Sequence, residues 1–218
     1  MKAQALVFLG PPGAGKGTQA SQAAAKFGIP HISTGEMLRQ AAAKGSPVGL
    51  AAKDKMEAGE LVPDDMMCRI VEERISEPDC RKGFVLDGFP RTVGQARFLD
   101  ELLERPGGRR LLVISLQVKP ELLMKRLTGR RVCPVCGAIY NMFLNPPAKD
   151  SFCDRDGARL TGRADDKEEA IRQRLAVYER DTAPLIDYYE KRAVLRNVDG
   201  GRDPAVIAEE LHGLLKDA

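Results

Sequence analysis

Residues 6–18 read LVFLGPPGAGKGT, and this stretch decides the fold. The apolar residues 6–9 predict a short buried strand, and helix-forming residues follow Thr18. Between strand and helix, the glycines allow a tight turn whose backbone N–H groups point inward. Lys16 adds a full positive charge where the helix begins. This order is typical of a phosphate-binding loop, and an ordinary glycine-rich turn with an exposed lysine is the alternative.

The loop departs from the strict phosphate-loop pattern at Gly17, which separates Lys16 from the hydroxyl of Thr18. The strict pattern has Ser or Thr directly after the lysine, where the hydroxyl binds magnesium. The sequence therefore gives weaker support to direct ligation of magnesium by Thr18.

Further apolar runs at residues 83–86, 111–118 and 193–198 are separated by helical patterning, and residues 31–33 read as a very short strand or loop. Buried strands that alternate with helices are typical of a parallel sheet covered by helices. We therefore expect an α/β fold, with a five-stranded parallel sheet in a P-loop core.

Two segments interrupt this alternation. Residues 33–62 contain alanine-rich helical pieces separated by glycine and proline, which predicts a small helical insertion. Residues 129–164 are rich in Gly, Pro, Cys, Asn and Asp, which predicts a second compact insertion. The core would then consist of residues 1–32, 63–128 and 165–218.

Composition narrows the class of protein. The chain has 218 residues, 43% hydrophobic and 30% charged, with a net charge of +3, which is typical of a globular protein. It has no Trp and few aromatic residues, which argues against a dedicated nucleic-acid binder. No apolar run is long enough for a membrane span, and no signal-peptide cleavage pattern follows the N-terminus. We expect a cytoplasmic protein without a membrane partner.

Residues 86–92 read LDGFPRT and end the second strong apolar run. Open α/β sheets bind ligands at the carboxyl ends of their strands. Asp87 is therefore a candidate to orient waters on a magnesium ion, and Arg91 a candidate to hold a second phosphate. A turn with a surface salt bridge is the alternative.

Several arginines have no acidic residue at helical spacing. In a helix predicted over residues 166–181, Arg172 has Glu168 one turn earlier, whereas Arg174 has no such partner. Arg126 also lacks one. Beside a phosphate-binding loop, this pattern favours phosphate as the missing negative charge, although solvated arginines are the alternative for each one singly.

Three of the five cysteines form a candidate metal site. Cys133 and Cys136 are separated by two residues. The same spacing recurs at Cys153, with Asp156 in the position of the second cysteine. This spacing predicts a tetrahedral Cys3Asp zinc site. A redox pair, an empty hydrogen-bonded site, and Asp154 as the fourth ligand are weaker alternatives. Four protein ligands leave no position for water, so the metal would be structural.

The two remaining cysteines, Cys68 and Cys80, have no partner pattern, and we expect them to be structural.

Over essentially its whole length the sequence resembles adenylate kinases, specifically the long bacterial form with a zinc-bearing lid. The resemblance is carried by several motifs in family order: residues 10–18, Ser33-Thr34-Gly35 with Arg39, residues 86–92 with Gln95, Gly129-Arg130-Arg131, Arg163-Ala164-Asp165-Asp166, and Arg174. It implies reversible phosphoryl transfer from Mg-ATP to AMP, giving two ADP, by a monomer with a structural zinc.

The resemblance also implies roles for individual residues. Residues 33–62 would bind AMP and residues 129–164 would form the lid. The implied ATP contacts are Gly13, Ala14, Gly15, Lys16, Gly17, Thr18, Arg126 and Arg130, with weaker support for Ile139, Tyr140 and Arg202. The implied AMP contacts are Thr34, Gly35, Arg39, Glu60, Leu61, Val62, Gly88, Phe89, Pro90, Arg91, Gln95, Arg163 and Arg174. The implied catalytic residues are Lys16, Arg91, Arg126, Arg130, Arg163 and Arg174.

The chemistry agrees with this resemblance. The acceptor phosphate is already ionised at neutral pH, so no general base is needed, and His31 and His212 lie outside the motifs. The rivals are a kinase for UMP or CMP, a kinase that uses GTP, and an NTPase whose cysteine ribbon binds nucleic acid. Thr34 and Gln95 favour AMP, and the lack of an aromatic stacking platform argues against nucleic acid.

Overall fold

The computed structural model describes residues 4–105 and 108–216, and it contains the expected parallel sheet. The five strands lie in the order β2-β3-β1-β4-β7, and all neighbouring pairs are parallel. The strands are β1 (Gln4–Leu9), β2 (His31–Ser33), β3 (Gly83–Asp87), β4 (Arg110–Gln117) and β7 (Leu195–Asp199). Residues 31–33 are therefore a strand rather than a loop, and the predicted P-loop core is confirmed.

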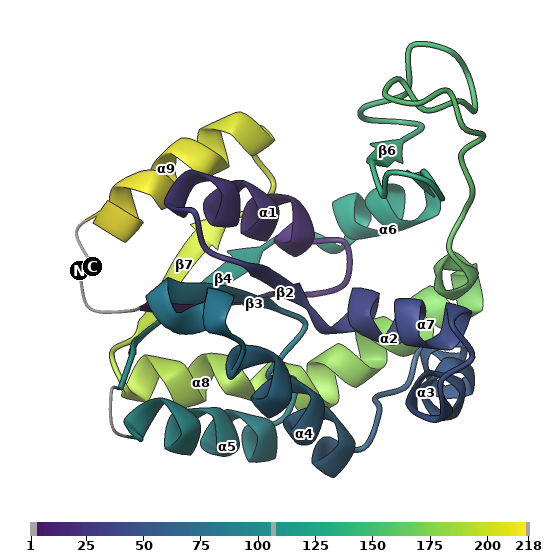
Figure 1. The fold of residues 1–218 in the computed structure, drawn as a ribbon. Helices are drawn as coiled ribbons and strands as arrows, with labels where there is room; N and C mark the ends of the chain where they lie inside the picture. Colours follow the sequence, from purple (N-terminus) through teal and green to yellow (C-terminus); the bar gives the residue numbers. More distant parts are fainter. Residues whose placement is uncertain (1–3, 106–107, 217–218) are drawn as a thin grey trace.

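Helices cover both faces of the sheet (Figure 1). Because side chains alternate along a strand, Leu6 and Phe8 of β1 pack on one face and Val7 on the other. The first face is covered by α1 (Lys16–Phe27), α6 (Pro120–Thr128) and α9 (Pro204–Lys216). The second is covered by α4 (Asp64–Ile75), α5 (Val93–Glu104) and α8 (Pro184–Lys191).

The strand register brings the motifs to one edge of the sheet. Phe8 pairs with Asp87, and Asp87 pairs with Ser33 on its other side. The phosphate-loop candidate, the LDGFPRT motif and the STG motif therefore begin beside one another, at the carboxyl ends of three adjacent strands.

The segment predicted as a helical insertion contains α2 (Thr34–Ala43) and α3 (Pro47–Ala58). Ser46 caps α3 by accepting a hydrogen bond from the Gly49 backbone N–H at 3.1 Å, and Pro47 occupies the first helical position. A 3-10 turn (Pro78–Lys82) follows α4 and leads into β3.

The cysteine-bearing segment extends away from the sheet beyond α6 (Figure 1). It contains an antiparallel ribbon of β5 (Arg130–Val132) and β6 (Ile139–Asn141), with further bridges from Val132 to Thr161 and from Phe152 to Arg159. Its hydrophobic cluster of buried residues is small: Cys133, Tyr140, Cys153 and Leu160.

The helix predicted over residues 166–181 has different bounds. A 3-10 turn (Ala164–Asp166) comes first, and α7 (Glu168–Val177) begins after Lys167, whose ψ of 144° is extended rather than helical. A π-helical turn (Tyr178–Thr182) then connects α7 to α8. Among the described helices, none combines the length and apolar character needed to cross a membrane.

Candidate active site

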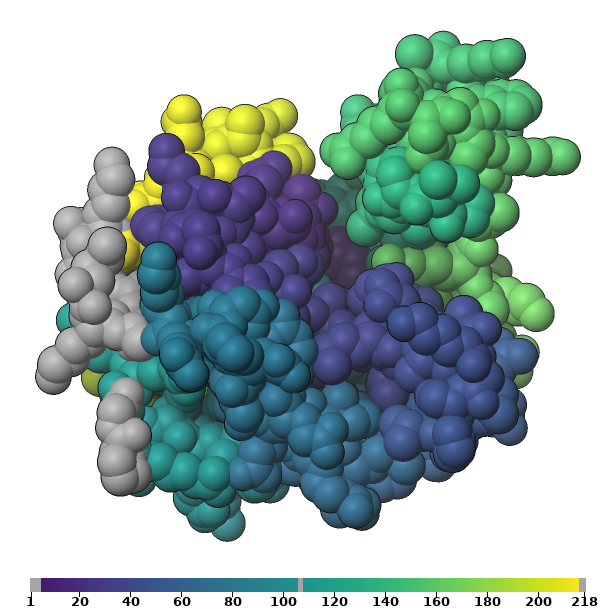
Figure 2. Space-filling view, viewed as in Figure 1, coloured from purple at the N-terminus to yellow at the C-terminus, as the bar shows by residue number. Residues whose placement is uncertain are grey.

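A single large cleft lies between the sheet edge, the α2–α3 segment and the cysteine-bearing ribbon (Figure 2). Its volume is about 2070 Å³. Pockets for one small ligand are usually about 300–1,000 Å³, so this cleft has room for two. Lys16, Arg91 and Arg174 all line it, together with Arg126, Arg130 and Arg163.

The phosphate-loop candidate is shaped by positive backbone φ angles at glycine. Gly13 and Gly15 have φ of 84° and 96°. A Cβ on Gly13 would meet the Leu123 carbonyl oxygen at 3.2 Å, and one on Gly10 would meet that of Leu116 at 2.6 Å. Side chains at Gly10 and Gly13 would therefore push the loop away from β4 and α6.

Lys16, the first residue of α1, folds back over this loop. Its Nζ donates to the carbonyl oxygens of Gly10 at 2.8 Å and Pro11 at 3.0 Å. Burial lowers the pKa of Lys16 to about 8; the charge of Asp87 opposes this shift, and nearby arginines, Arg91 foremost, add to it. An anion placed among these cations would be bound strongly.

Asp87 ends β3 beside the loop and fits the predicted role in holding magnesium through water. A Cβ on Gly17 would lie 3.2 Å from Asp87 Oδ2, so the absence of a side chain at position 17 leaves space in front of the carboxylate. Burial raises the pKa of Asp87, but the neighbouring His31 imidazole and the charge of Lys16 outweigh it and hold the pKa below its usual value. The ionised carboxylate is a ligand type that magnesium prefers.

His31 lies outside the sequence motifs, yet its Nε2 lies 3.7 Å from Asp87 Oδ2. The pairing of β2 with β3 places His31 level with Val85, so His31 and Asp87 are diagonal neighbours on one face of the sheet. If residues 31–33 are taken as a strand beside residues 83–87, the meeting of parallel strands at one sheet edge predicts that His31 lies near Asp87.

The arginines differ in their partners. Arg91 donates from Nε to the Gly88 carbonyl at 2.9 Å, and Arg126 from Nη1 to that of Ala14 at 3.3 Å. Burial and the charge of Arg130 lower the pKa of Arg163 to about 10. Within the described residues, no carboxylate forms an ion pair with any of these three.

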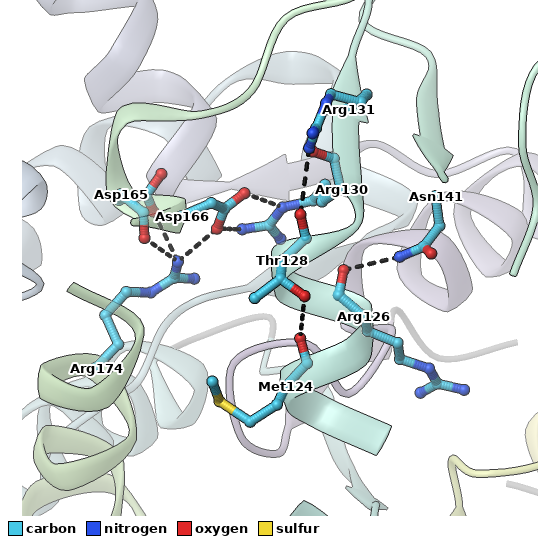
Figure 3. A network of polar contacts seen from close by, with 9 residues as sticks. All are labelled: Met124, Arg126, Thr128, Arg130, Arg131, Asn141, Asp165, Asp166 and Arg174. Carbon is cyan, nitrogen blue, oxygen red and sulfur yellow. Dashed lines mark hydrogen bonds and ion pairs between the residues drawn. The ribbon is translucent and has the colours of Figure 1, made fainter. Parts of the chain in front are cut away.

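For Arg174 the expectation of a missing acid is wrong. Its Nη1 lies 3.0 Å from Asp165 Oδ2 and 3.1 Å from Asp166 Oδ1 (Figure 3). Both acids lie in the 3-10 turn that precedes α7, and the extended backbone of Lys167 separates this turn from α7, so α-helical spacing does not apply. Asp166 also accepts from Arg130 Nε at 2.7 Å and forms a second contact through Arg130 Nη2. Arg172 does pair with Glu168, as predicted, at 2.7 Å.

Most of the residues predicted to bind AMP line the cleft. Thr34 Oγ1 donates to the Gly88 carbonyl at 2.9 Å, which joins the STG motif to the LDGFPRT motif. Arg39 is ion-paired with Glu36 at 3.0 Å. The residues of this predicted set that line the cleft are Thr34, Gly35, Arg39, Glu60, Leu61, Val62, Gly88, Arg91, Gln95, Arg163 and Arg174.

Two predicted AMP residues do not line the cleft: Phe89 and Pro90 are buried, and Phe89 belongs to the core beneath the sheet.

The three residues with weaker support as ATP contacts all border the cleft, but they differ in where their side chains make contacts. Ile139 and Arg202 line the cleft, and Arg202 is ion-paired with Glu210. Tyr140 also borders the cleft, but its hydroxyl lies 3.5 Å from Cys153 Sγ and accepts the Asp154 backbone N–H at 2.9 Å. The polar end of Tyr140 therefore belongs to the cysteine cluster.

The four predicted zinc ligands come together. One donor atom from each of Cys133, Cys136, Cys153 and Asp156 lies within 4.8 Å of all the others. Cys136 Sγ and Cys153 Sγ are 3.5 Å apart, close to the distance of about 3.8 Å between two sulfurs on one tetrahedral zinc. The Val135 and Cys136 backbone N–H groups both donate to Cys133 Sγ at 3.4 Å, which is the support expected for a metal-bound thiolate.

The charge of the set also suits a dication. The neighbouring Asp156 carboxylate raises the pKa of the Cys136 thiol to about 12. Without a cation the four donors cannot all be ionised, so binding of a metal would release protons. Among the described residues no other such group of His, Cys, Asp or Glu is found.

Comparison with known proteins assigns the family. The family model for adenylate kinase matches residues 8–194. The chain is 51% identical to an adenylate kinase of Archaeoglobus fulgidus over 97% of each chain, and 51% identical to one of Carboxydothermus hydrogenoformans over 98% of each. It is 48% identical to one of Bacillus subtilis over 96% of this chain and 97% of the relative. With a phosphate loop and converging cations in one cleft, the chain belongs to the adenylate kinase family and is a nucleoside monophosphate kinase.

Proposed function

We propose that the enzyme transfers a phosphoryl group reversibly from Mg-ATP to AMP and so forms two ADP. The observation that carries the proposal is the convergence of Lys16, Arg91 and Arg174 on one cleft. The mutual influence of these cations supports it, because Arg91 and Arg174 both lower the pKa of Lys16. Phosphate groups of two substrates, placed among these cations, would supply negative charge to Lys16 and to Arg91, which has no carboxylate ion pair within the described residues.

Each substrate would occupy one part of the cleft. In this proposal residues 33–62 form the AMP-binding domain, residues 129–164 form the lid over ATP, and residues 1–32, 63–128 and 165–218 form the core. The phosphate loop of residues 13–18, with Arg126 and Arg130, would hold ATP. Thr34, Arg39, Gln95 and the backbone of residues 60–62 would hold AMP.

Catalysis would come from positioning and charge. Lys16 holds the transferring group from the ATP side, and Arg91 holds the AMP phosphate that attacks it. Arg163 and Arg174 bridge the two, which offsets the repulsion between anionic substrates as they meet. Closure of the two insertions excludes water, which would otherwise accept the phosphoryl group.

Two metals complete the proposal. Magnesium bound with ATP would neutralise phosphate charge as it develops, with Asp87 orienting its waters. Zinc held by Cys133, Cys136, Cys153 and Asp156 would stabilise the lid, which has only a small buried cluster of its own.

We also propose that the enzyme acts as a cytoplasmic monomer. The monomer is the state that the resemblance to the adenylate kinase family implies. The five cysteines are free thiols, as expected in a reducing compartment.

A coupled assay tests the proposal by crossing ATP and GTP as donors with AMP, UMP, CMP and GMP as acceptors. ATP with AMP should give the highest kcat/KM. Arg91→Ala should lower turnover at least about a hundredfold, roughly 2.7 kcal/mol of transition-state stabilisation. A preference for UMP or CMP, or near-wild-type turnover of the purified variant, would refute the assignment.

A further inference from the structure

We infer that Asp64 sets the purine preference of the acceptor site by fixing the orientation of the Gln95 side-chain amide. Asp64 is the first residue of α4, and Gln95 lies in the first turn of α5. Asp64 Oδ1 accepts a hydrogen bond from Gln95 Nε2 at 2.7 Å. Gln95 borders the cleft, whereas Asp64 does not, so Asp64 is a positioning residue. The inference rests on the proposed function, in which Gln95 contacts the AMP base.

The contacts of the amide allow only one orientation. Gln95 Oε1 accepts the Arg91 backbone N–H at 2.8 Å, while Nε2 donates to Asp64. A backbone N–H can only donate and a carboxylate can only accept. Turning the amide over would set oxygen against carboxylate and N–H against N–H, so both contacts would become repulsive.

The carboxylate is itself held in place. Asp64 Oδ2 accepts from Thr92 Oγ1 at 2.6 Å, and Thr92 Oγ1 accepts the Gln95 backbone N–H at 3.1 Å. A Cβ on Gly94 would lie 3.1 Å from Asp64 Oδ2, so the first turn of α5 closes around this oxygen. With both oxygens engaged, Asp64 presents a fixed acceptor to Gln95.

The fixed orientation of the Gln95 amide decides which purine base it can pair with. After its two internal contacts, Gln95 keeps one N–H donor and one oxygen lone pair. Adenine offers an amino donor at position 6 beside an acceptor at N1, whereas guanine offers an acceptor at position 6 beside a donor at N1. An amide that pairs with the adenine edge in a fixed orientation opposes the guanine edge at both atoms. Polarity mismatches of this kind discriminate between ligands more strongly than small differences in ligand size do.

The test is Asp64→Asn, which keeps the size of the side chain but can donate as well as accept. Gln95 can then turn over at the loss of one contact, the hydrogen bond from the Arg91 N–H. We expect the ratio of kcat/KM for AMP to that for GMP, with ATP as donor, to fall at least about tenfold, about 1.4 kcal/mol of discrimination. The change should come mainly from a higher KM for AMP.

The matched control is Asp65→Asn in the same helical turn. Asp65 is exposed and pairs with Arg69 at 3.2 Å, so its loss should leave the ratio unchanged. In a Gln95→Ala background, Asp64→Asn should have no further effect on the ratio, because coupled residues are not additive. If Asp64→Asn does not fold, Thr92→Val releases the same carboxylate and should shift the ratio in the same direction.

The outcomes separate the two proposals. If the wild-type enzyme does not phosphorylate AMP, the proposed function fails. If it does, and Asp64→Asn lowers the melting temperature but keeps the AMP to GMP ratio, Asp64 is structural and this inference is overturned. An equal change in the ratio with Asp65→Asn, or in the Gln95→Ala background, would overturn it as well.

Discussion

At the scale of single residues, Lys16 has a strongly lowered pKa in the cleft. A lysine in water has a pKa near 10.5, and burial brings that of Lys16 to about 8. The lysine remains mostly protonated at neutral pH, because its pKa is only about one unit above that pH. Its charge is therefore both essential to the proposed mechanism and sensitive to conditions.

Replacing Lys16 with methionine should remove this charge while keeping an unbranched side chain. We expect turnover to fall at least about a hundredfold, because the transition state loses a cation next to the transferring group. Steady-state kinetics on the purified variant measure this. Lys26→Met, at the exposed end of the same helix, is the control and should remain active. Near-wild-type turnover of Lys16→Met would contradict the role.

The pH dependence follows from the lowered pKa of Lys16. As the pH rises through about 8, the free enzyme loses the lysine proton, so kcat/KM should fall on the alkaline side. Bound phosphates favour the charged lysine, and the corresponding fall in kcat should occur at higher pH. A kcat/KM profile that stays level to pH 10 would show that Lys16 is not the titrating group.

At the scale of elements, the two insertions have different sources of stability. Residues 33–62 add Leu38 of α2, Ala52 of α3 and Val62, which follows α3, to the main core cluster. The cysteine-bearing segment of residues 129–164 instead buries a separate small cluster that includes Cys133 and Cys153. The ribbon therefore needs its proposed metal in a way that the helical segment does not.

Cys153→Ser should release the metal and destabilise the ribbon. We expect the melting temperature to fall by about 5–10 °C, as for a loss of about 2–3 kcal/mol in a chain of this size. Metal analysis of the purified wild type should give one zinc per chain. Cys68→Ser, a partly buried cysteine outside the cluster, should keep its zinc. Well below one equivalent in the wild type, or an unchanged melting temperature in Cys153→Ser, would count against structural zinc.

At the scale of the whole molecule, Asp166 joins parts that are distant in sequence. Its carboxylate contacts Arg130 at the start of β5 and Arg174 in α7 (Figure 3). Nearby, Asn141 of β6 donates to the Arg126 carbonyl at 2.8 Å, where α6 ends. These contacts hold the base of the ribbon against the core, and Asp166 sets the positions of the Arg130 and Arg174 guanidinium groups.

Asp166→Asn should leave Arg130 and Arg174 without this shared anion. Only 6% of the Asp166 side chain is exposed, so removing its charge should lower the free energy of unfolding by about 3 kcal/mol. Thermal unfolding measures the loss, which should be smaller with saturating ADP, because bound phosphates supply negative charge. Glu168→Gln breaks an exposed pair and should change stability by about 0.5 kcal/mol at most. An equal loss with and without ADP would contradict this account.

The sequence by itself determined the features that depend on local order. The strand, glycine turn and lysine of residues 6–18 follow one another directly in the sequence. The two metal-ligand pairs, Cys133 with Cys136 and Cys153 with Asp156, each have a two-residue spacer that lets both ligands bind one metal. The alternation of apolar runs with helices likewise predicted the parallel sheet. In each case the constraint acts between residues that are close in sequence, or it appears as a regular spacing of apolar residues.

Only the tertiary structure decided which distant polar groups meet. Asp64 reaches Gln95 because α4 packs beside α5, and Asp166 satisfies Arg174 from a turn whose geometry helical spacing does not describe. His31 reaches Asp87 through strand pairing, and the Tyr140 hydroxyl turns to Cys153 rather than to the cleft. A side chain's partner over such distances is set by how elements pack, and packing depends on the whole core rather than on any local pattern.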